Sequence, residues 1–369
     1  MRVEPSCPPA AGGTNDPEPD ARTMRAIVRD RYGDTRVLRL DEVRRPVPGE
    51  HDVVVRVEAA GVDRGALHIL TGLPYLSRLI FGVRRPKTAA LGTEVAGTVV
   101  AVGPEVTGVS VGDEVFGFGR GAFAEYALVA DDRLAHKPPG LSFEHAATLP
   151  VSGVTALQAV HDHGCVQEGQ RVLVTGASGG VGSFAVQLAK AAGAHVTGVC
   201  SPAKADLVRS LGADEIVDHT REDFADGTRR YDVILDIAGN PALSRLRRAL
   251  TPHGTAVIVG GEEGGSLTGG MNRQLGALVL SRFVGQRFTM FVTSVHAPDL
   301  ERLVTLVTEG RITPRVDRSY PLDEVADAMR RLETGEARGK IVIRVGTDGR
   351  ARRAGQPVAV DLDALPAGT

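Results

Sequence analysis

The chain has 369 residues, of which 42% are hydrophobic and 24% are charged, and its formal net charge is −2. This length allows two domains with buried cores, and the composition is that of an ordinary soluble globular protein. The small net charge favours neither nucleic acid nor an anionic membrane surface as a partner. No apolar run approaches the ~20 residues that a membrane-spanning helix needs, so we expect no membrane partner.

Three cysteines, Cys7, Cys165 and Cys200, lie far apart and form no C-x-x-C pair. A disulfide framework or a cysteine-rich zinc site is therefore not expected, and a reducing cytoplasmic location fits. Residues 1–23 are rich in Pro, Gly, Ala, Asp and Glu and lack an apolar core, so we interpret them as a disordered leader. Residues 346–369, rich in Gly, Arg and Ala, are predicted to be a flexible tail.

Residues 24–150 contain short alternating or β-branched segments, separated by Pro-Gly, Gly-Asp and Gly-Pro turn signals. The predicted strands are 24–30, 37–43, 52–60 and 94–102, followed by a hairpin-like pair at 111–117 and 121–129. Strands this short and closely spaced indicate a small, mostly antiparallel β-barrel. Residues 142–160 are predicted to be helical, with a break at Leu149 and Pro150.

From Arg171 the pattern changes to an alternation of strands and helices, which predicts a doubly wound parallel sheet. The predicted strands are 172–175, 195–200, 215–218, 232–236, 255–259 and 288–292, and the predicted helices are 181–192, 202–211, 221–224, 241–250 and 271–281. A helix at 298–309, a strand at 315–320, a helix at 322–334 and a strand at 340–345 follow. We expect these last elements to return to the first domain.

The expected fold is therefore α/β with two domains. Residues 24–150 and 296–345 would form a discontinuous, barrel-like domain, and residues 151–295 would form the domain with the doubly wound sheet.

The most informative segment runs from Val172 to Lys190, where a β-branched run enters a glycine-rich turn and continues as an apolar-periodic helix. This order suits the pyrophosphate of a dinucleotide, because the unpaired N–H groups and positive dipole end of a helix N-terminus attract anions. Ala177 replaces the first glycine of G-x-G-x-x-G, so the pattern alone is weak and an ordinary glycine-rich turn is the alternative. The candidate cofactor-binding residues are Ser178, Gly179, Gly180, Val181 and Gly182.

The residues after strand 195–200 indicate which nicotinamide dinucleotide is used. An NAD-specific domain usually carries Asp or Glu there to hold the ribose hydroxyls. Here Ser201 can donate a hydrogen bond and Lys204 supplies a positive charge, which suits a 2′-phosphate. We predict NADPH over NADH, the alternative being that Lys204 is an ordinary solvated lysine. At the ends of later strands, the small residues Ala238, Gly239 and Gly260 would leave room for the nicotinamide ribose.

Motifs spread over residues 24–345 carry a resemblance to a known family. They are R-P-V-P-G (45–49), V-E-A-A-G-V-D (57–63), L-G-T-E-V-A-G (91–97), V-G-D-E-V-F-G (111–117), G-A-F-A-E-Y (121–126), the glycine turn, L-G-A-D (211–214) and A-R-G-K-I-V (337–342). In this order they resemble the medium-chain dehydrogenase/reductase superfamily, and most closely its zinc-free branch of quinone oxidoreductases and alkenal or enoyl reductases. The resemblance implies a GroES-like catalytic domain, a Rossmann domain and an active-site cleft between them.

The resemblance also assigns further residues to the cofactor. Thr155 would border the nicotinamide, and Lys340 in the last motif would contact the cofactor. Relatives often place a Tyr near the adenosine after the third strand, and His219 stands at that position here.

Zinc-dependent relatives carry a Cys where this chain has Asp63 and a His where it has Thr93, and their lobe of four closely spaced cysteines has no counterpart. A catalytic zinc site needs about three converging ligands, usually Cys and His. We therefore predict no metal site, with Glu94 acting as a hydrogen-bonding or structural carboxylate.

The segment from Gly61 to Tyr75 would face the nicotinamide. Asp63 would accept a hydrogen bond from the amide or the ribose, and His68 would orient or protonate the substrate, since an ordinary imidazole pKa of about 6.5 suits acid catalysis. Tyr75 is an alternative donor or wall of the site. The opposing interpretation is that His68 only packs in its helix and that Asp63 caps it.

We therefore expect an NADPH-dependent, zinc-independent reductase that transfers hydride to a quinone or an α,β-unsaturated carbonyl. A 2-enoyl-thioester reductase, with Arg78, Arg84, Arg85 and Lys87 at a basic entry, and a non-catalytic NADPH-binding regulatory protein are the alternatives. The apolar strand 288–292 would be an exposed sheet edge, so we expect a homodimer.

Overall fold

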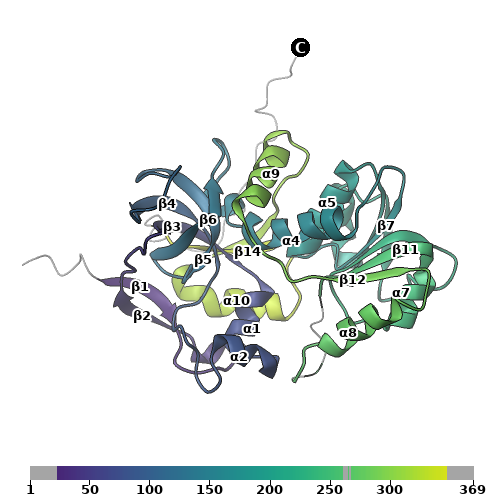
Figure 1. Ribbon diagram of the computed structural model, residues 1–369, viewed down its shortest axis with the longest axis horizontal. Helices are drawn as coiled ribbons and strands as arrows, with labels where there is room; N and C mark the ends of the chain where they lie inside the picture. The colour runs from purple at the N-terminus through teal and green to yellow at the C-terminus, as the bar shows by residue number, and fades with distance from the viewer. Residues whose placement is uncertain (1–22, 261–264, 266, 347–369) are drawn as a thin grey trace, which may run out of the picture.

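The computed structural model describes residues 23–260, 265 and 267–346 (Figure 1). The predicted disordered leader and flexible tail lie outside these residues, apart from Thr23 and Gly346 at their inner ends. In Figure 1 a barrel-like unit lies on the left and a parallel sheet flanked by helices lies on the right.

The barrel-like unit is built on one six-stranded sheet in the order β13-β14-β3-β4-β5-β6. Strand β3 pairs with both β4 and β6, so the central strands close on themselves, and every pairing except β13–β14 is antiparallel. The small antiparallel barrel is thus confirmed. The strands are β3 (Asp52–Val62), β4 (Glu94–Val102), β5 (Glu114–Arg120), β6 (Tyr126–His136), β13 (Val316–Pro321) and β14 (Lys340–Arg344).

Two strands expected in the barrel lie outside its main sheet. β1 (Thr23–Val28) and β2 (Arg39–Arg44) form a separate antiparallel pair, joined to the rest by isolated bridges such as Ala26–Ala124. The physical reason is visible in β2, where five of the six residues are exposed, so this strand has no apolar face to bury in the barrel.

Short helices surround the barrel and connect it to the second unit. They are the 3₁₀ turn η1 (Thr35–Val37), α1 (Arg64–Thr71), the 3₁₀ turn η2 (Tyr75–Ser77), α2 (Arg78–Phe81), α3 (Phe143–Ala146), η3 (Leu149–Gly153), α4 (Val154–Leu157), η4 (Gln158–His163), the 3₁₀ turn η6 (Leu322–Glu324) and α10 (Val325–Glu333). The helical stretch expected at 142–160 is present. Its irregularity centres on Pro150, which lacks an N–H donor, and η3 and η4 are wound as π-helix.

The second unit is a parallel six-stranded sheet in the order β12-β11-β10-β7-β8-β9. Counted from β7, this is the doubly wound order of dinucleotide-binding folds, and it confirms the predicted α/β class. The strands are β7 (Arg171–Thr175), β8 (His195–Cys200), β9 (Glu215–Asp218), β10 (Tyr231–Asp236), β11 (Leu250–Ile258) and β12 (Arg287–Met290). The helical segments are α5 (Gly180–Ala191), η5 (Pro202–Lys204), α6 (Ala205–Ser210), α7 (Leu243–Ala249) and α8 (Met271–Leu280). The next helix, α9 (Ala297–Thr308), packs against β6 of the barrel.

The helical piece expected at 221–224 is wrong, because the side chain of Asp218 organises a turn there instead. Its carboxylate accepts hydrogen bonds from the N–H and the hydroxyl of Thr220 at 2.9 and 2.7 Å. This local bonding competes with a helix.

The chain returns to the barrel at its C-terminal side, since β14 pairs with β3 through Ile341 and Val62. Hydrogen bonds also join the units; for example, the Gly339 N–H donates to the Ser178 carbonyl at 2.8 Å, and the Gln187 amide donates to the Thr313 carbonyl at 3.1 Å. On these pairings we propose the two-domain division suggested by the sequence, with residues 296–345 belonging to the barrel domain.

Candidate active site

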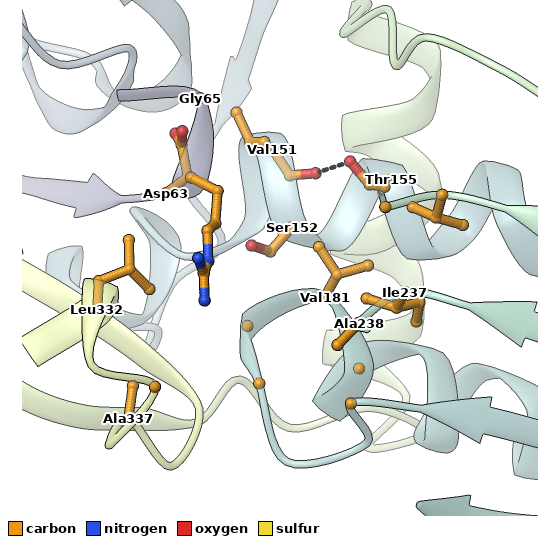
Figure 2. Close-up of a pocket in the computed structure, with 18 of the residues that line it drawn as sticks. Asp63, Gly65, Val151, Ser152, Thr155, Val181, Ile237, Ala238, Leu332 and Ala337 are labelled. Carbon is orange, nitrogen blue, oxygen red and sulfur yellow. Dashed lines mark hydrogen bonds between the residues drawn. The ribbon is translucent and has the colours of Figure 1, made fainter. Parts of the chain in front are cut away.

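A cavity of about 810 Å³ lies between the two units, at the carboxyl edge of the parallel sheet. Figure 2 shows Asp63 and Leu332 from the barrel side across from Ile237 and Ala238 of the parallel-sheet side, with the helical segment carrying Ser152 beside the gap. This volume lies within the range of ordinary cofactor and substrate pockets. The position is also where open α/β sheets bind ligands.

The glycine turn forms the floor of this cavity. Gly176 has a φ of 62°, which glycine adopts without strain, and α5 begins at Gly180 after an extended Gly179. A Cβ on Gly182 would overlap the carbonyl oxygen of Gly176, so only glycine lets the helix start this close to the strand. The first turn of α5 contains no acidic residue, so its N–H groups and dipole can attract an anion. The predicted residues Ser178, Gly179, Gly180, Val181 and Gly182 all line the cavity.

Space for a dinucleotide is kept by small residues on both sides of the turn. A Cβ on Gly180 would lie 2.9 Å from Cδ of Lys340, and one on Gly260 would overlap the carbonyl oxygen of Ile237. Ala238 and Gly260 line the cavity as predicted. Because a Cβ would fill this cradle and the anion-binding helix end opens into it, the residues present fit a nicotinamide dinucleotide.

A buried ion pair stands behind the glycine turn. Nζ of Lys340 donates to Oε2 of Glu94, and both side chains are almost fully buried. Oε1 of Glu94 accepts from the backbone N–H of Val151 at 2.8 Å. Burial raises the pKa of Glu94 to about 7, although the charge of Lys340 opposes this shift. Lys340 lines the cavity beside Gly180.

Lys204 lies at the end of the cavity near the C-terminus of β8. Its Nζ donates to the carbonyl oxygens of Gly335 at 2.6 Å and Ala337 at 2.8 Å, and the residue lines the cavity. Partial burial lowers the pKa of Lys204 from its ordinary value. The nearest carboxylate in sequence, Asp206, is paired with Arg338 at 2.7 Å. The corner therefore presents a lysine where a ribose-binding acid would otherwise be expected.

The opposite end is organised by bonds between segments far apart in the chain. The hydroxyl of Thr155 donates to the Val151 carbonyl at 2.6 Å (Figure 2) and lies 2.8 Å from the hydroxyl of Thr293. Arg273 on α8 is paired with the buried Asp236, whose pKa burial raises to about 6. Thr293 and Gln274 line the cavity, and Arg273 pairs with Asp236. None of the three could be predicted, because no local pattern links them to the glycine turn.

Asp63 and His68, the predicted catalytic residues, both line the cavity. Oδ1 of Asp63 accepts from the N–H of Ala66 at 2.8 Å, so Asp63 is the N-cap of α1, as the opposing interpretation held. Nδ1 of His68 lies 2.9 Å from the carbonyl oxygen of Leu73. Because a carbonyl only accepts, Nδ1 carries a proton and Nε2 is the ring nitrogen left for a substrate.

Four predicted site residues are not among those that line the cavity: Tyr75, Ser201, His219 and Gly239. Tyr75 is 48% exposed, its ring centre lies 4.7 Å from the Arg78 guanidinium, and the residue is not among those that line the cavity. His219 is exposed beyond β9, and Ser201 stands at the start of η5. Gly239 is exposed, with a φ of 82°, in the turn after β10.

The positions at which zinc-dependent relatives carry ligands lie close together in this chain. Thr93 donates from its hydroxyl to Oδ2 of Asp63 at 3.2 Å, and Glu94 follows directly on β4. A threonine hydroxyl and a carboxylate that already accepts two hydrogen bonds are a poor donor set for zinc. Within the described part of the chain, no group of three or more His, Cys, Asp and Glu side chains is arranged to hold a metal ion.

Comparisons with known proteins agree with this architecture. Residues 49–139 match the family described as alcohol dehydrogenase GroES-like domain, and residues 211–343 match the family described as zinc-binding dehydrogenase. The NAD(P)H oxidoreductase RTN4IP1, mitochondrial, of Mus musculus is 34% identical over 358 residues, covering 87% of this chain and 89% of that protein. The chain belongs to the medium-chain dehydrogenase/reductase superfamily. Within it, the chain is an NAD(P)H-dependent oxidoreductase of the quinone oxidoreductase-like branch.

Other members of the superfamily extend the comparison. The chloroplastic quinone-oxidoreductase QR1 of Triphysaria versicolor is 32% identical over 338 residues, covering 87% of this chain and 98% of that protein. Among solved structures, the quinone oxidoreductase from Coxiella burnetii aligns with a TM-score of 0.78 and 26% identity, over 88% of this chain and 100% of that one. Mycobacterial Rv1454c, solved in complex with NADPH, aligns with a TM-score of 0.75 and 26% identity, over 87% and 100%.

The Glu94–Lys340 pair predicts a pH-dependent affinity for the cofactor. With a pKa of about 7, Glu94 is neutral at lower pH and ionised at higher pH, where it cancels the positive charge of Lys340 beside the phosphate site. We expect the Kd for NADPH to rise by up to about tenfold from about pH 6 to about pH 8. Glu94→Gln keeps the shape but removes the titration, so this rise should disappear.

Fluorescence titration of NADPH across this pH range measures both curves. The 2′-phosphate of NADPH titrates equally with both proteins, so only the difference between wild type and variant reports on Glu94. Parallel curves for the two proteins would contradict this assignment.

Proposed function

We propose that this protein is an NADPH-dependent, zinc-independent reductase that transfers hydride to a quinone or an α,β-unsaturated carbonyl compound. The observation that carries the proposal is one cavity that joins an anion-binding helix end to an imidazole. Gly180 to Gly182 line it at one side and His68 lines it at the other. The names of the quinone oxidoreductase relatives support the acceptor class.

The chain's own residues bind and orient the dinucleotide. The N–H groups at the start of α5 would hold the pyrophosphate, with Lys340 beside them, and Lys204 would hold the 2′-phosphate. Gly260 and Ala238 leave space for the nicotinamide ribose. When bound, the reduced nicotinamide supplies a hydride.

The acceptor end needs only modest help from the protein, because quinones and enones are already polarised. The cavity walls from both domains exclude water. With Nδ1–H held by the Leu73 carbonyl, the imidazolium form of His68 would donate the Nε2 proton to the oxygen that becomes negative and would be left as the neutral ring. Asp63 fixes the start of α1 and so positions His68 four residues beyond Arg64. The pairing of Asp63 with Thr93 at the family's ligand positions supports zinc independence.

Two further expectations belong to the proposal. β12 is an edge strand of the parallel sheet and pairs with β11 alone among the described strands, which favours a homodimer formed through that edge. Among the described residues, no helix is both long and apolar enough to cross a bilayer. The cytoplasmic location stays a prediction.

The proposed reaction predicts chelator-resistant consumption of NADPH. We expect the absorbance of the reduced nicotinamide to fall with benzoquinones or enones at the same rate with and without a metal chelator. An enoyl thioester should be reduced more slowly. Tight NADPH binding with no consumption over the acceptor panel would contradict the proposal and favour the non-catalytic alternative, whereas loss of activity with chelator would contradict zinc independence.

Replacing Lys204 tests the cofactor preference. Lys204→Glu places a negative charge where the 2′-phosphate would bind, so we expect kcat/KM for NADPH to fall by about 10- to 100-fold while that for NADH changes little. Steady-state kinetics with both cofactors measure this. Lys204 also bonds two backbone carbonyls, and loss of that structural role would lower both values equally. An unchanged NADPH/NADH ratio would therefore remove Lys204 from the cofactor site.

Replacing His68 tests the proton-donating role. His68→Ala should lower kcat with an enone by about 100-fold or more, while the Kd for NADPH stays unchanged. Tyr75→Phe is the matched control, because the Tyr75 ring lies outside the cavity and its hydroxyl should contribute nothing. Nearly full activity in His68→Ala would show that another group supplies the proton.

A further inference from the structure

Large apolar side chains are exposed on both sides of the cavity. On the barrel side Leu76, Leu79, Ile80 and Val83 are exposed in and after η2 and α2, with Ile80 at 70%. On the other side Met271 and Leu275 are exposed on α8, at 41% and 54%. We call these six residues the mouth patch. Met271 and Leu275 are four positions apart on α8, so they lie on one face of the helix, one turn apart.

The two halves of the mouth patch meet at the cavity. The N–H of Leu76 donates to the carbonyl oxygen of Leu267 at 3.4 Å, so the loops before α2 and α8 are in contact. Figure 1 shows α2 and the start of α8 together at the lower edge of the molecule. Pro74 and Gln274, which directly neighbour this patch in sequence, line the cavity. The mouth patch therefore borders the entrance to the site.

The charge around this entrance differs from the charge of the whole chain. Residues 64–93 contain five basic residues and no acidic one, and residues 265–298 contain three basic residues and no acidic one, although Glu262 and Glu263 precede this range. Those two glutamates lie outside the described residues. Arg84, Arg85 and Lys87 are exposed directly after Val83, and among the described residues none of the three is in an ion pair with a carboxylate.

We propose that the mouth patch docks on an anionic phospholipid bilayer, so that a hydrophobic acceptor dissolved in the bilayer enters the cavity directly. Exposed apolar side chains beside unpaired basic ones match the interface of such a membrane, where apolar groups enter the acyl region and Arg and Lys bind headgroup phosphates. The net charge of −2 argued against this partner, but it averages over a chain in which residues 64–93 carry five basic residues and no acidic one.

A second copy of the chain is a poorer occupant of the same patch. In a two-fold dimer the patch would meet itself, which brings Arg84, Arg85 and Lys87 of the two copies toward one another. Like charges set against each other disfavour that interface. The edge of β12 remains available for self-association.

Vesicle co-sedimentation tests the proposal without any turnover. We expect the protein to bind vesicles of phosphatidylcholine mixed with phosphatidylglycerol and to bind phosphatidylcholine alone much more weakly. Leu79→Ser/Ile80→Ser should weaken binding by about tenfold or more, because it removes apolar side chains that would enter the bilayer. Arg85→Glu should also weaken binding by about tenfold or more, since each basic group near an anionic surface adds roughly a factor of five to the affinity. The matched controls Val47→Ser/Val111→Ser and Arg171→Glu change exposed residues outside the patch and should bind as wild type does.

The outcome separates the occupants. No binding to either vesicle, or equal binding by the patch variants and the wild type, overturns the proposal. A fall in oligomer mass by light scattering in the patch variants, without vesicle binding by the wild type, assigns the patch to a second copy instead and also overturns it.

The delivery of the acceptor from the bilayer rests on the proposed function: patch variants should reduce a water-soluble quinone normally but a quinone held in anionic vesicles slowly. Equal rates there would overturn membrane delivery, whereas inactivity of the wild type with both quinones would instead overturn the proposed function.

Discussion

The buried pair of Lys340 and Glu94 is the interaction on which the site depends. Lys340 comes from β14, Glu94 from β4, and the carboxylate also holds the backbone of Val151, where the chain enters the helical connection to the parallel-sheet unit. Removing one partner of a buried pair leaves an unpaired charge and costs about 3–5 kcal/mol. The pair therefore fixes where the barrel stands relative to the glycine turn.

Close packing at this junction leaves little freedom for the residues that face it. The aliphatic part of Lys340 passes within 2.9 Å of where a Cβ on Gly180 would lie, and the Gly339 N–H is bonded to Ser178 in the turn. The start of α5 is thus held against the barrel by the same segment that supplies the lysine. A negative ligand placed here meets helix N–H groups and a lysine that are already in position, which is the kind of preorganisation that binding and catalysis require.

Much of the fold could be predicted because its signals are local. β4, β8 and β9 end exactly where the sequence pattern put them, and the alternation of strands and helices after Arg171 sufficed for the parallel sheet. The glycine turn could be predicted equally well, because its residues are consecutive in the sequence. The segment 221–224 was predicted wrongly, since an Asp–Thr hydrogen bond organises a turn where the alternation of strands and helices suggested a helix.

The rest of the site rests on contacts between distant residues. Glu94 and Lys340 are 246 positions apart, and Asp236 and Arg273 are joined only by the folding of α8 over the sheet edge. Tyr75 looked like a site residue by position, but the stacking of Arg78 holds its ring at the surface. The clustering of exposed apolar and basic side chains at the entrance is likewise a property of the surface, which whole-chain composition averages away.

The central claim is that this cavity brings a nicotinamide dinucleotide into direct contact with a polarised acceptor. Transfer of deuterium from NADPH labelled at C4 of the nicotinamide to an enone measures this most directly. The account predicts that, with one of the two C4 epimers, mass spectrometry finds one deuterium on the β-carbon of the reduced product, and that reaction in heavy water places none at that carbon. Oxidation of labelled NADPH with neither epimer giving deuterium at that carbon would contradict it.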